Sequence, residues 1–341
     1  MSHWLHALFI PTLMVTLGYQ QSNVHGETLR PVPPSVRITF VGDIMLDRTP
    51  GRVMVAGKDP FAYVAELLDD ADITIGNLEC VVATSGQAIE KPYNFRADTR
   101  SIPLLAKHFD AVSLANNHTG DYGPEALVEM IGRLDRAKLP YFGAGRNRRE
   151  AHAPWIVEKN GLKVAVLGYN EFKPRSFEAG ETTPGSSWSD DAAVVADIKA
   201  VRGKVDLVLT FMHWGHEYEL EPEDRQKALA RTMIDAGADA VIGGHPHVVE
   251  SFELYKDKPI AYSLGNFVFD DFKDIDEAAM LEPSRTGWIL TLTMAKTGLV
   301  SWRTTVTRTD DDGFPRPLPN VKGPEGSVAI ALPAISLEKA R

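Results

Sequence analysis

The chain has 341 residues, with 36 Lys and Arg against 46 Asp and Glu, and a formal net charge of -10 at pH 7. A protein this acidic is not built to coat nucleic acid or an anionic membrane, so we expect no nucleic-acid partner, and local cations must hold any anionic substrate. The single cysteine, Cys80, excludes an intramolecular disulfide.

The N-terminal segment predicts export. Residues Leu5–Tyr19 are apolar and uncharged, too short for a membrane span of about 20 residues but suited to the core of a signal peptide. No Lys or Arg precedes them, so a cytosolic tail remains the alternative. We assign residues 1–27 to a signal peptide or short membrane anchor and 28–35 to a Pro-rich linker, which predicts a periplasmic protein or one on the outer face of the cytoplasmic membrane.

Strands and helices then alternate along the chain. Strands are predicted at residues 36–41, 73–78, 111–114, 163–168, 205–212, 240–243 and 259–264. Helices are predicted at residues 60–69, 102–108, 124–138, 190–202 and 223–236. This alternation indicates a mostly parallel sheet.

The chain changes character after residue 285. Trp288–Met294 and Val300–Thr307 alternate in polarity around a turn and predict a β-hairpin. We therefore expect a mixed α/β (α+β) domain over residues 36–310 and a Pro-rich C-terminal tail over 311–341, with 313–326 as loop and 328–339 as a terminal helix. The polar connections 172–188 and 270–285 are predicted to be lids or partly disordered loops.

Metal-ligand residue types follow five of the predicted strands. They are Asp43, Glu79, Asn116–His118, His213 and His245–His247. Parallel strands place their carboxyl ends at one edge of a sheet, so these side chains are expected to converge. Oxygen and nitrogen ligands without thiolates suit Mn, Fe, Zn or Mg, and we expect one or two divalent ions, Mn, Fe or Zn.

Two of these segments carry further predictions. The glycines before His245 and His247 let the backbone bend, so that both imidazoles can reach one metal edge; surface histidines on a polar loop are the alternative. His118 is a candidate proton donor, and Asp121 can hold its other ring nitrogen. A helix cap before Pro124 explains the Asn and Asp residues equally well.

Cations and amides near these segments suggest substrate contacts. Lys91 and Arg96 share a loop with two aromatic residues, and with Arg48 they could clamp a carboxylate or phosphate. Solvated surface charge is an equal alternative for Lys91. Asn266 follows a strand-like run and could hydrogen-bond a ligand.

In these segments the chain resembles the CapA family of poly-gamma-glutamate capsule synthesis proteins. The resemblance rests on these blocks, in the family's order: Gly42–Arg48, Asn77–Glu79, Lys91–Arg96, Ala115–Asp121, His213–Tyr218, Gly244–Val249 and Ser263–Phe269. That family is in turn similar to the calcineurin-like metallophosphoesterases, which implies a four-layer αββα sandwich. It also implies metal-ligand roles for Asp43, Glu79, Asn117, His213, His245 and His247, and a proton-donor role for His118.

The chain departs from the phosphoesterase pattern at two positions. Met45 stands where those enzymes usually carry a histidine ligand, and Glu79 stands where they usually carry a bridging aspartate. A hard divalent metal gains little from a thioether, so one metal position lacks a ligand.

Three functions remain open from the sequence. The first is an envelope-associated, metal-dependent hydrolase or transferase that acts on poly-gamma-glutamate or a related anionic capsule polymer. The second is a non-catalytic, polymer-binding assembly subunit of a membrane synthase. The third is a small-molecule phosphoesterase, which rests on fold analogy alone.

Overall fold

The computed structural model describes Met1 and residues 33–271 and 282–328. Its larger sheet has eight strands in the order β16-β15-β14-β1-β2-β3-β4, with β13 also pairing with β1. Their bounds are β1 Ser35–Ile44, β2 Ile73–Leu78, β3 Ala111–Ser113, β4 Tyr141–Phe142, β13 Asn266–Val268, β14 Thr286–Ala295, β15 Gly298–Thr309 and β16 Pro315–Ser327. Strands β1 to β4 run parallel, and β14 to β16 extend the sheet antiparallel.

The second sheet has six strands in the order β11-β12-β10-β9-β7-β6, and β5 and β8 form a separate pair. Their bounds are β5 Ala144–Gly145, β6 Trp155–Lys159, β7 Leu162–Asn170, β8 Gly185–Ser186, β9 Leu207–His213, β10 Ala240–Gly244, β11 Phe252–Tyr255 and β12 Lys258–Ala261. The central strands β7, β9, β10 and β12 are parallel. Their carboxyl ends therefore meet at one edge of the sheet.

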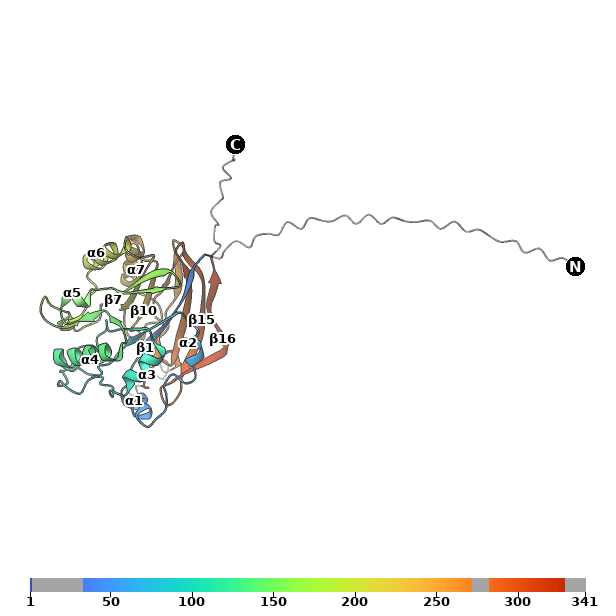
Figure 1. Ribbon diagram of the computed structural model, residues 1–341. Coiled ribbons are helices and arrows are strands. Elements are labelled where there is room, and N and C mark those ends of the chain that lie inside the picture. The colour runs from blue at the N-terminus through green and yellow to red at the C-terminus, as the bar shows by residue number, and fades with distance from the viewer. Residues whose placement is uncertain (2–32, 272–281, 329–341) are drawn as a thin grey trace. The chain divides into compact units, whose positions relative to one another are not determined.

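The helices cover the outer faces of the two sheets. They are α1 Arg48–Val55, α2 Ala65–Asp69, α3 Ser101–His108, α4 Gly123–Ala137, α5 Arg148–Ala151, α6 Asp191–Arg202 and α7 Asp224–Ala236, with a 3-10 turn at Arg175–Phe177. Helices α1 to α4 share an apolar cluster with one face of the larger sheet, and α6 and α7 share another with the second sheet. A third cluster lies between the sheets. The predicted four-layer αββα sandwich is confirmed (Figure 1).

The period-two pattern of β1 explains how it serves two layers at once. Ile38 and Phe40 point into the cluster between the sheets, whereas Val41 points toward α1 to α4. Phe40 meets Phe211 of β9 with ring centroids 6.2 Å apart. The two sheets are thus joined by side chains of their central strands.

Several element predictions need correction. The helix expected at 60–69 is only Ala65–Asp69, and helix α1 was not predicted. The loop prediction for 313–326 was wrong, because all but the first two of these residues belong to β16. Strand β16 pairs with β15 alone, and an edge strand tolerates prolines whose missing N–H groups face away from the ladder.

Some predictions fall on residues outside the described part. This group contains the leader after Met1, most of the linker and residues 272–281 of the second polar connection. It also contains all of the predicted terminal helix except Val328. Of the first connection, residues Gly185–Ser186 pair with β5. No helix among the described residues has both the length and the apolar character needed to cross a membrane.

Candidate metal centre

Six predicted metal ligands lie together at the strand ends of both sheets. Asp43 lies on β1, Glu79 directly follows β2, Asn117 follows β3, His213 ends β9, and His245 and His247 follow β10. All six side chains are buried. The convergence expected from the sequence therefore occurs, with the larger sheet supplying the oxygen ligands and the second sheet the imidazoles.

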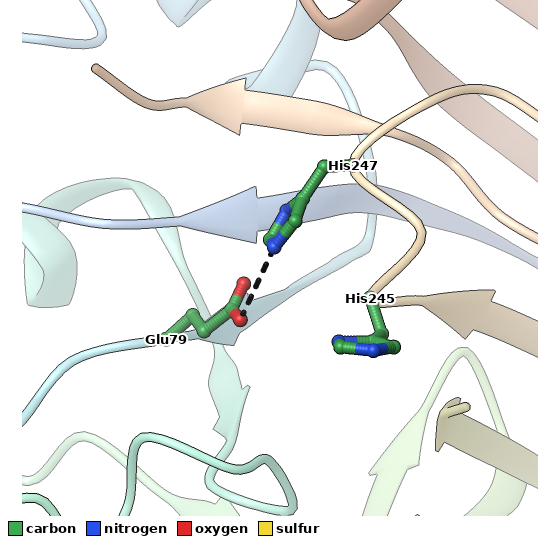
Figure 2. Close-up of side chains that lie close together, drawn as sticks. All are labelled: Glu79, His245 and His247. Atoms are coloured by element: carbon green, nitrogen blue, oxygen red, sulfur yellow. Dashed lines mark ion pairs between the residues drawn. The ribbon is translucent and has the colours of Figure 1, made fainter. Parts of the chain in front are cut away.

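Two groups of ligand atoms can be distinguished, and Glu79 belongs to both. Atoms of Glu79, His245 and His247 lie within 4.8 Å of one another, as do atoms of Asp43, Glu79 and His213. Glu79 Oε1 is 3.5 Å from His213 Nε2 and 3.9 Å from His247 Nε2. Figure 2 shows Glu79 and His247 directed toward one another, with His245 beside them.

The buried polar atoms at this centre fit a bound cation. Among the described residues, neither carboxylate oxygen of Glu79 and neither ring nitrogen of His245 has a hydrogen-bond partner. Burial raises the pKa of Glu79 well above its usual value, and the charge of Asp43 adds to the effect. Burial also lowers the pKa of His213 and of His245 well below the usual value, which keeps both imidazoles neutral, as metal ligands must be.

The backbone after β10 is bent so that its histidines reach Asp43. A Cβ atom at position 244 would lie only 2.6 Å from Asp43 Oδ1, and glycine avoids this close contact. The next amide, of His245, donates a 3.0 Å hydrogen bond to Asp43 Oδ2. His245 and His247 have φ of 97° and 59°, a conformation that costs energy for residues with side chains and often marks functional sites.

Two amide side chains orient the ligands: Asn116, which was expected at the converging strand ends, and Asn77, which was not predicted as a site residue. Asn77 Nδ2 donates to Asp43 Oδ1 at 2.8 Å and lies 3.2 Å from His213 Nδ1. Asn116 Nδ2 in turn donates to Asn77 Oδ1 at 3.0 Å. The position of Asn77 on the strand that leads to Glu79 was the available signal, since hydrogen-bonded partners usually hold metal ligands in place.

His118 and Asp121 form the predicted pair beside the ligand groups. His118 Nδ1 lies 2.7 Å from Asp121 Oδ2, and its Nε2 lies 3.9 Å from Glu79 Oε1. Burial lowers the pKa of His118 to about 4, although Asp121 opposes the shift. The pair can therefore orient one ring nitrogen of His118 toward the ligand groups.

The four predicted substrate contacts divide into two sets. Lys91 Nζ pairs with Asp121 Oδ1 at 2.5 Å and donates to the Asn117 carbonyl at 2.8 Å, so it supports the His118 pair. Asn266 Oδ1 lies 2.9 Å from His247 Nδ1. Arg48 and Arg96 are not among the ligand groups and line an adjacent cavity.

Two further side chains define the centre. Phe172 packs on His245 with ring centroids 3.8 Å apart and was not predicted as a site residue. It lies two residues after the end of β7, a strand end at which no site residue was expected. Met45 is buried in the apolar cluster beneath α1, and its sulfur faces the Asp47 amide at 3.3 Å. The thioether therefore does not join the ligand groups.

Comparison with known proteins identifies the family of the chain that carries this centre. The family described as "Bacterial capsule synthesis protein PGA_cap" matches residues 37–271, which contain every ligand named above. The chain belongs to this family. It is 36% identical over 238 residues to the "PGA biosynthesis protein CapA" of Bacillus subtilis, covering 68% of this chain and 63% of that protein.

A second relative agrees with this assignment, and a solved structure shares the fold. The "Capsule biosynthesis protein CapA" of Bacillus anthracis is 36% identical over 284 residues, covering 77% of this chain and 68% of that protein. A crystal structure of a hypothetical protein from Thermus thermophilus matches with a TM-score of 0.50 at 18% identity, covering 79% of this chain and 98% of the other. The latter supports the fold alone. The chain thus spans a little under two thirds of the B. subtilis relative.

Proposed function

We propose that this protein is an envelope-associated, metal-dependent hydrolase or transferase in the synthesis or processing of a poly-γ-glutamate or related anionic capsule polymer. The observation that supports it is the pair of buried ligand groups that share Glu79, in a chain of the PGA_cap family. Carboxylate oxygens and neutral imidazoles without thiolates are a donor set for Mn, Fe or Zn.

Each residue of the centre has a part in this proposal. One or two divalent ions would be held by six side chains: Asp43, Glu79, Asn117, His213, His245 and His247. A metal at such a site polarises a scissile carbonyl or phosphoryl group. His118 would exchange a proton with the leaving group, held in orientation by Asp121, whose second oxygen pairs with Lys91.

A second candidate is a non-catalytic polymer-binding subunit of a membrane synthase. The position of Met45 favours it, because the buried thioether leaves the group around Asp43 without the histidine that similar phosphoesterases usually have. A centre with fewer ligands could retain polymer affinity without turnover. Export to the periplasm or the outer face of the cytoplasmic membrane suits both candidates.

Metal content and polymer turnover of the full-length protein test these candidates together. We expect one or two equivalents of Mn, Fe or Zn by elemental analysis, lost in a His245→Ala/His247→Ala double variant. The matched control is His216→Ala, because the His216 side chain is 70% exposed and pairs with Glu223. Turnover is measured as the change in poly-γ-glutamate chain length with time.

The outcomes separate the candidates. Metal bound together with a fall in polymer length, both lost in the double variant, supports the enzyme. Metal or polymer bound without any turnover, with or without candidate synthase subunits, contradicts the enzyme and supports the assembly subunit. Absence of metal from the reconstituted protein overturns the metal-dependent mechanism.

A further inference from the structure

A cavity of about 550 Å³ lies next to the metal centre. Its walls are helix α1, the residues before it, and the segments around residues 83–84 and 96–99. Three arginines line it: Arg48, Arg52 and Arg96. Arg52 was in no sequence-based prediction.

The two carboxylates in the cavity wall are engaged elsewhere. Asp47 accepts the Arg48 amide at 2.7 Å on one oxygen and the Arg96 amide at 2.8 Å on the other. Asp98 is held by Arg100, whose Nε and Nη2 each donate to it at 2.9 Å. Arg100 does not line the cavity, and its hydrogen bonds lower the pKa of Asp98 to about 2.

The side chains of Arg52 and Arg96 line the cavity and contribute positive charge to its wall. In the described residues, neither lies within 4.0 Å of a carboxylate oxygen, whereas ion pairs hold many other arginines of this acidic chain. Arg96 lies 3.9 Å above the Tyr122 ring and donates to the Ser85 carbonyl, which fixes its orientation. Arg52 Nη2 donates to Thr49 Oγ1 at 2.9 Å, and its side chain is exposed to solvent. Guanidinium groups arranged in this way suit a carboxylate.

One side chain, Phe95, contacts both His118 beside the metal centre and Arg48 of the cavity wall. The Phe95 ring stacks on His118 with centroids 4.1 Å apart. The Arg48 guanidinium lies 5.3 Å from the centroid of that same Phe95 ring. The cavity wall at Arg48 is thus separated from His118 by one aromatic ring, a separation that a following unit of an extended ligand could span.

We propose that this cavity is a carboxylate subsite that binds a pendant carboxylate of a polyanionic substrate, away from the unit at the metal centre, with Arg52 as its main determinant. The inference rests on the proposed function, because it assumes that the ligand is a carboxylate polymer. A subsite of this kind makes affinity depend on the length of the ligand, since a short ligand at the metal centre cannot reach the cavity.

Calorimetric titration of the full-length protein with a short and a long γ-linked glutamate oligomer tests the proposal. We expect Arg52→Ala to weaken binding of the long oligomer about fivefold to tenfold, the loss of one partly exposed charge-assisted contact, and to leave the short oligomer unchanged. Arg52→Lys should restore part of the affinity. The long oligomer with its free α-carboxylates amidated should bind the wild type and Arg52→Ala equally weakly, because it has no carboxylate for the subsite.

The control is Arg149→Ala, which removes the same charge from an exposed position outside the cavity lining. Equal affinities of wild type and Arg52→Ala for the long oligomer, or an equal effect of Arg149→Ala, overturn the subsite. Failure of the wild type to bind either oligomer, with its metal present, overturns the polymer substrate itself, and the subsite falls with it. The two failures are thus distinguishable.

Discussion

The interior between the sheets and the strand-end centre are both buried, but they differ in whether their side chains find partners within the protein. On β1, Ile38 and Phe40 are fully buried among apolar side chains of the second sheet, which satisfy them completely. Three residues after Phe40, Asp43 is equally buried and lies beside Glu79, whose carboxylate has no hydrogen-bond partner among the described residues. Strand β1 thus contributes both to an apolar interior that is stable without a ligand and to a polar centre that a bound cation would stabilise.

The comparison shows how this fold separates stability from function. Apolar burial contributes about 25 cal/mol for each Å² removed from water, so the interior stabilises the fold without a ligand. Burying an unpaired carboxylate costs free energy, which a bound cation offsets. The centre should therefore lower the free energy of unfolding of the metal-free protein and raise it when metal is bound.

The largest expected effect comes from the interior. Phe40→Ala removes a ring that meets Phe211 across the sheets and should lower the free energy of unfolding by about 3 to 5 kcal/mol. Chemical denaturation measures this change, and the metal content of the folded variant should equal that of the wild type. The half-exposed Ile156 serves as control, since Ile156→Ala should cost less than about 1 kcal/mol. Loss of metal in folded Phe40→Ala would contradict the separation.

The next effect comes from the centre. A divalent metal at a hundredfold excess over its Kd should stabilise the wild type by about 2.7 kcal/mol, and a chelator should remove this gain. Glu79→Gln should abolish the gain, because Glu79 contributes to both ligand groups. In chelator the variant should be at least as stable as the wild type, because a neutral amide replaces a carboxyl group whose ionisation burial opposes. Denaturation with and without metal measures both, and an unchanged gain in Glu79→Gln would refute the shared-ligand arrangement.

A further effect, which depends on pH, involves Glu250, a buried carboxyl beside α7 whose Oε2 accepts from Gln226 at 2.8 Å. Burial raises the pKa of Glu250 to about 7. A carboxyl whose folded pKa is raised contributes stability below its unfolded pKa of about 4.3 and loses it as the pH rises through about 7. The free energy of unfolding of Glu250→Gln should therefore rise by about 3 kcal/mol relative to that of the wild type between pH 4.5 and pH 8.

Matched denaturation curves at these two pH values measure the difference for Glu250→Gln. Exposed Glu158 provides the control, because Glu158→Gln should change the difference by less than about 0.5 kcal/mol. A wild type and a Glu250→Gln variant with the same pH dependence would show that Glu250 is not buried in solution.

The candidate site was more predictable from the sequence than several of the elements around it. Asp43, Glu79, His213 and His245 each follow an apolar run, and a parallel sheet brings such positions to one edge whatever the details of its helices. Helix α1 carries Pro50 and Gly51 and has no long apolar period, so its sequence did not indicate a helix. Strand β16 contains four prolines and could be recognised only from its pairing with β15.

The sequence by itself determined the layered α/β architecture and which polar residues meet, because side-chain periodicity and strand-end position depend on neighbours along the chain. Only the tertiary structure decided the partners of those residues. It paired Lys91 with Asp121, placed Phe172 on His245, turned Met45 into the core and gathered Arg48, Arg52 and Arg96 around one cavity. These contacts join segments distant in sequence, and they depend on packing and charge compensation that no local pattern encodes.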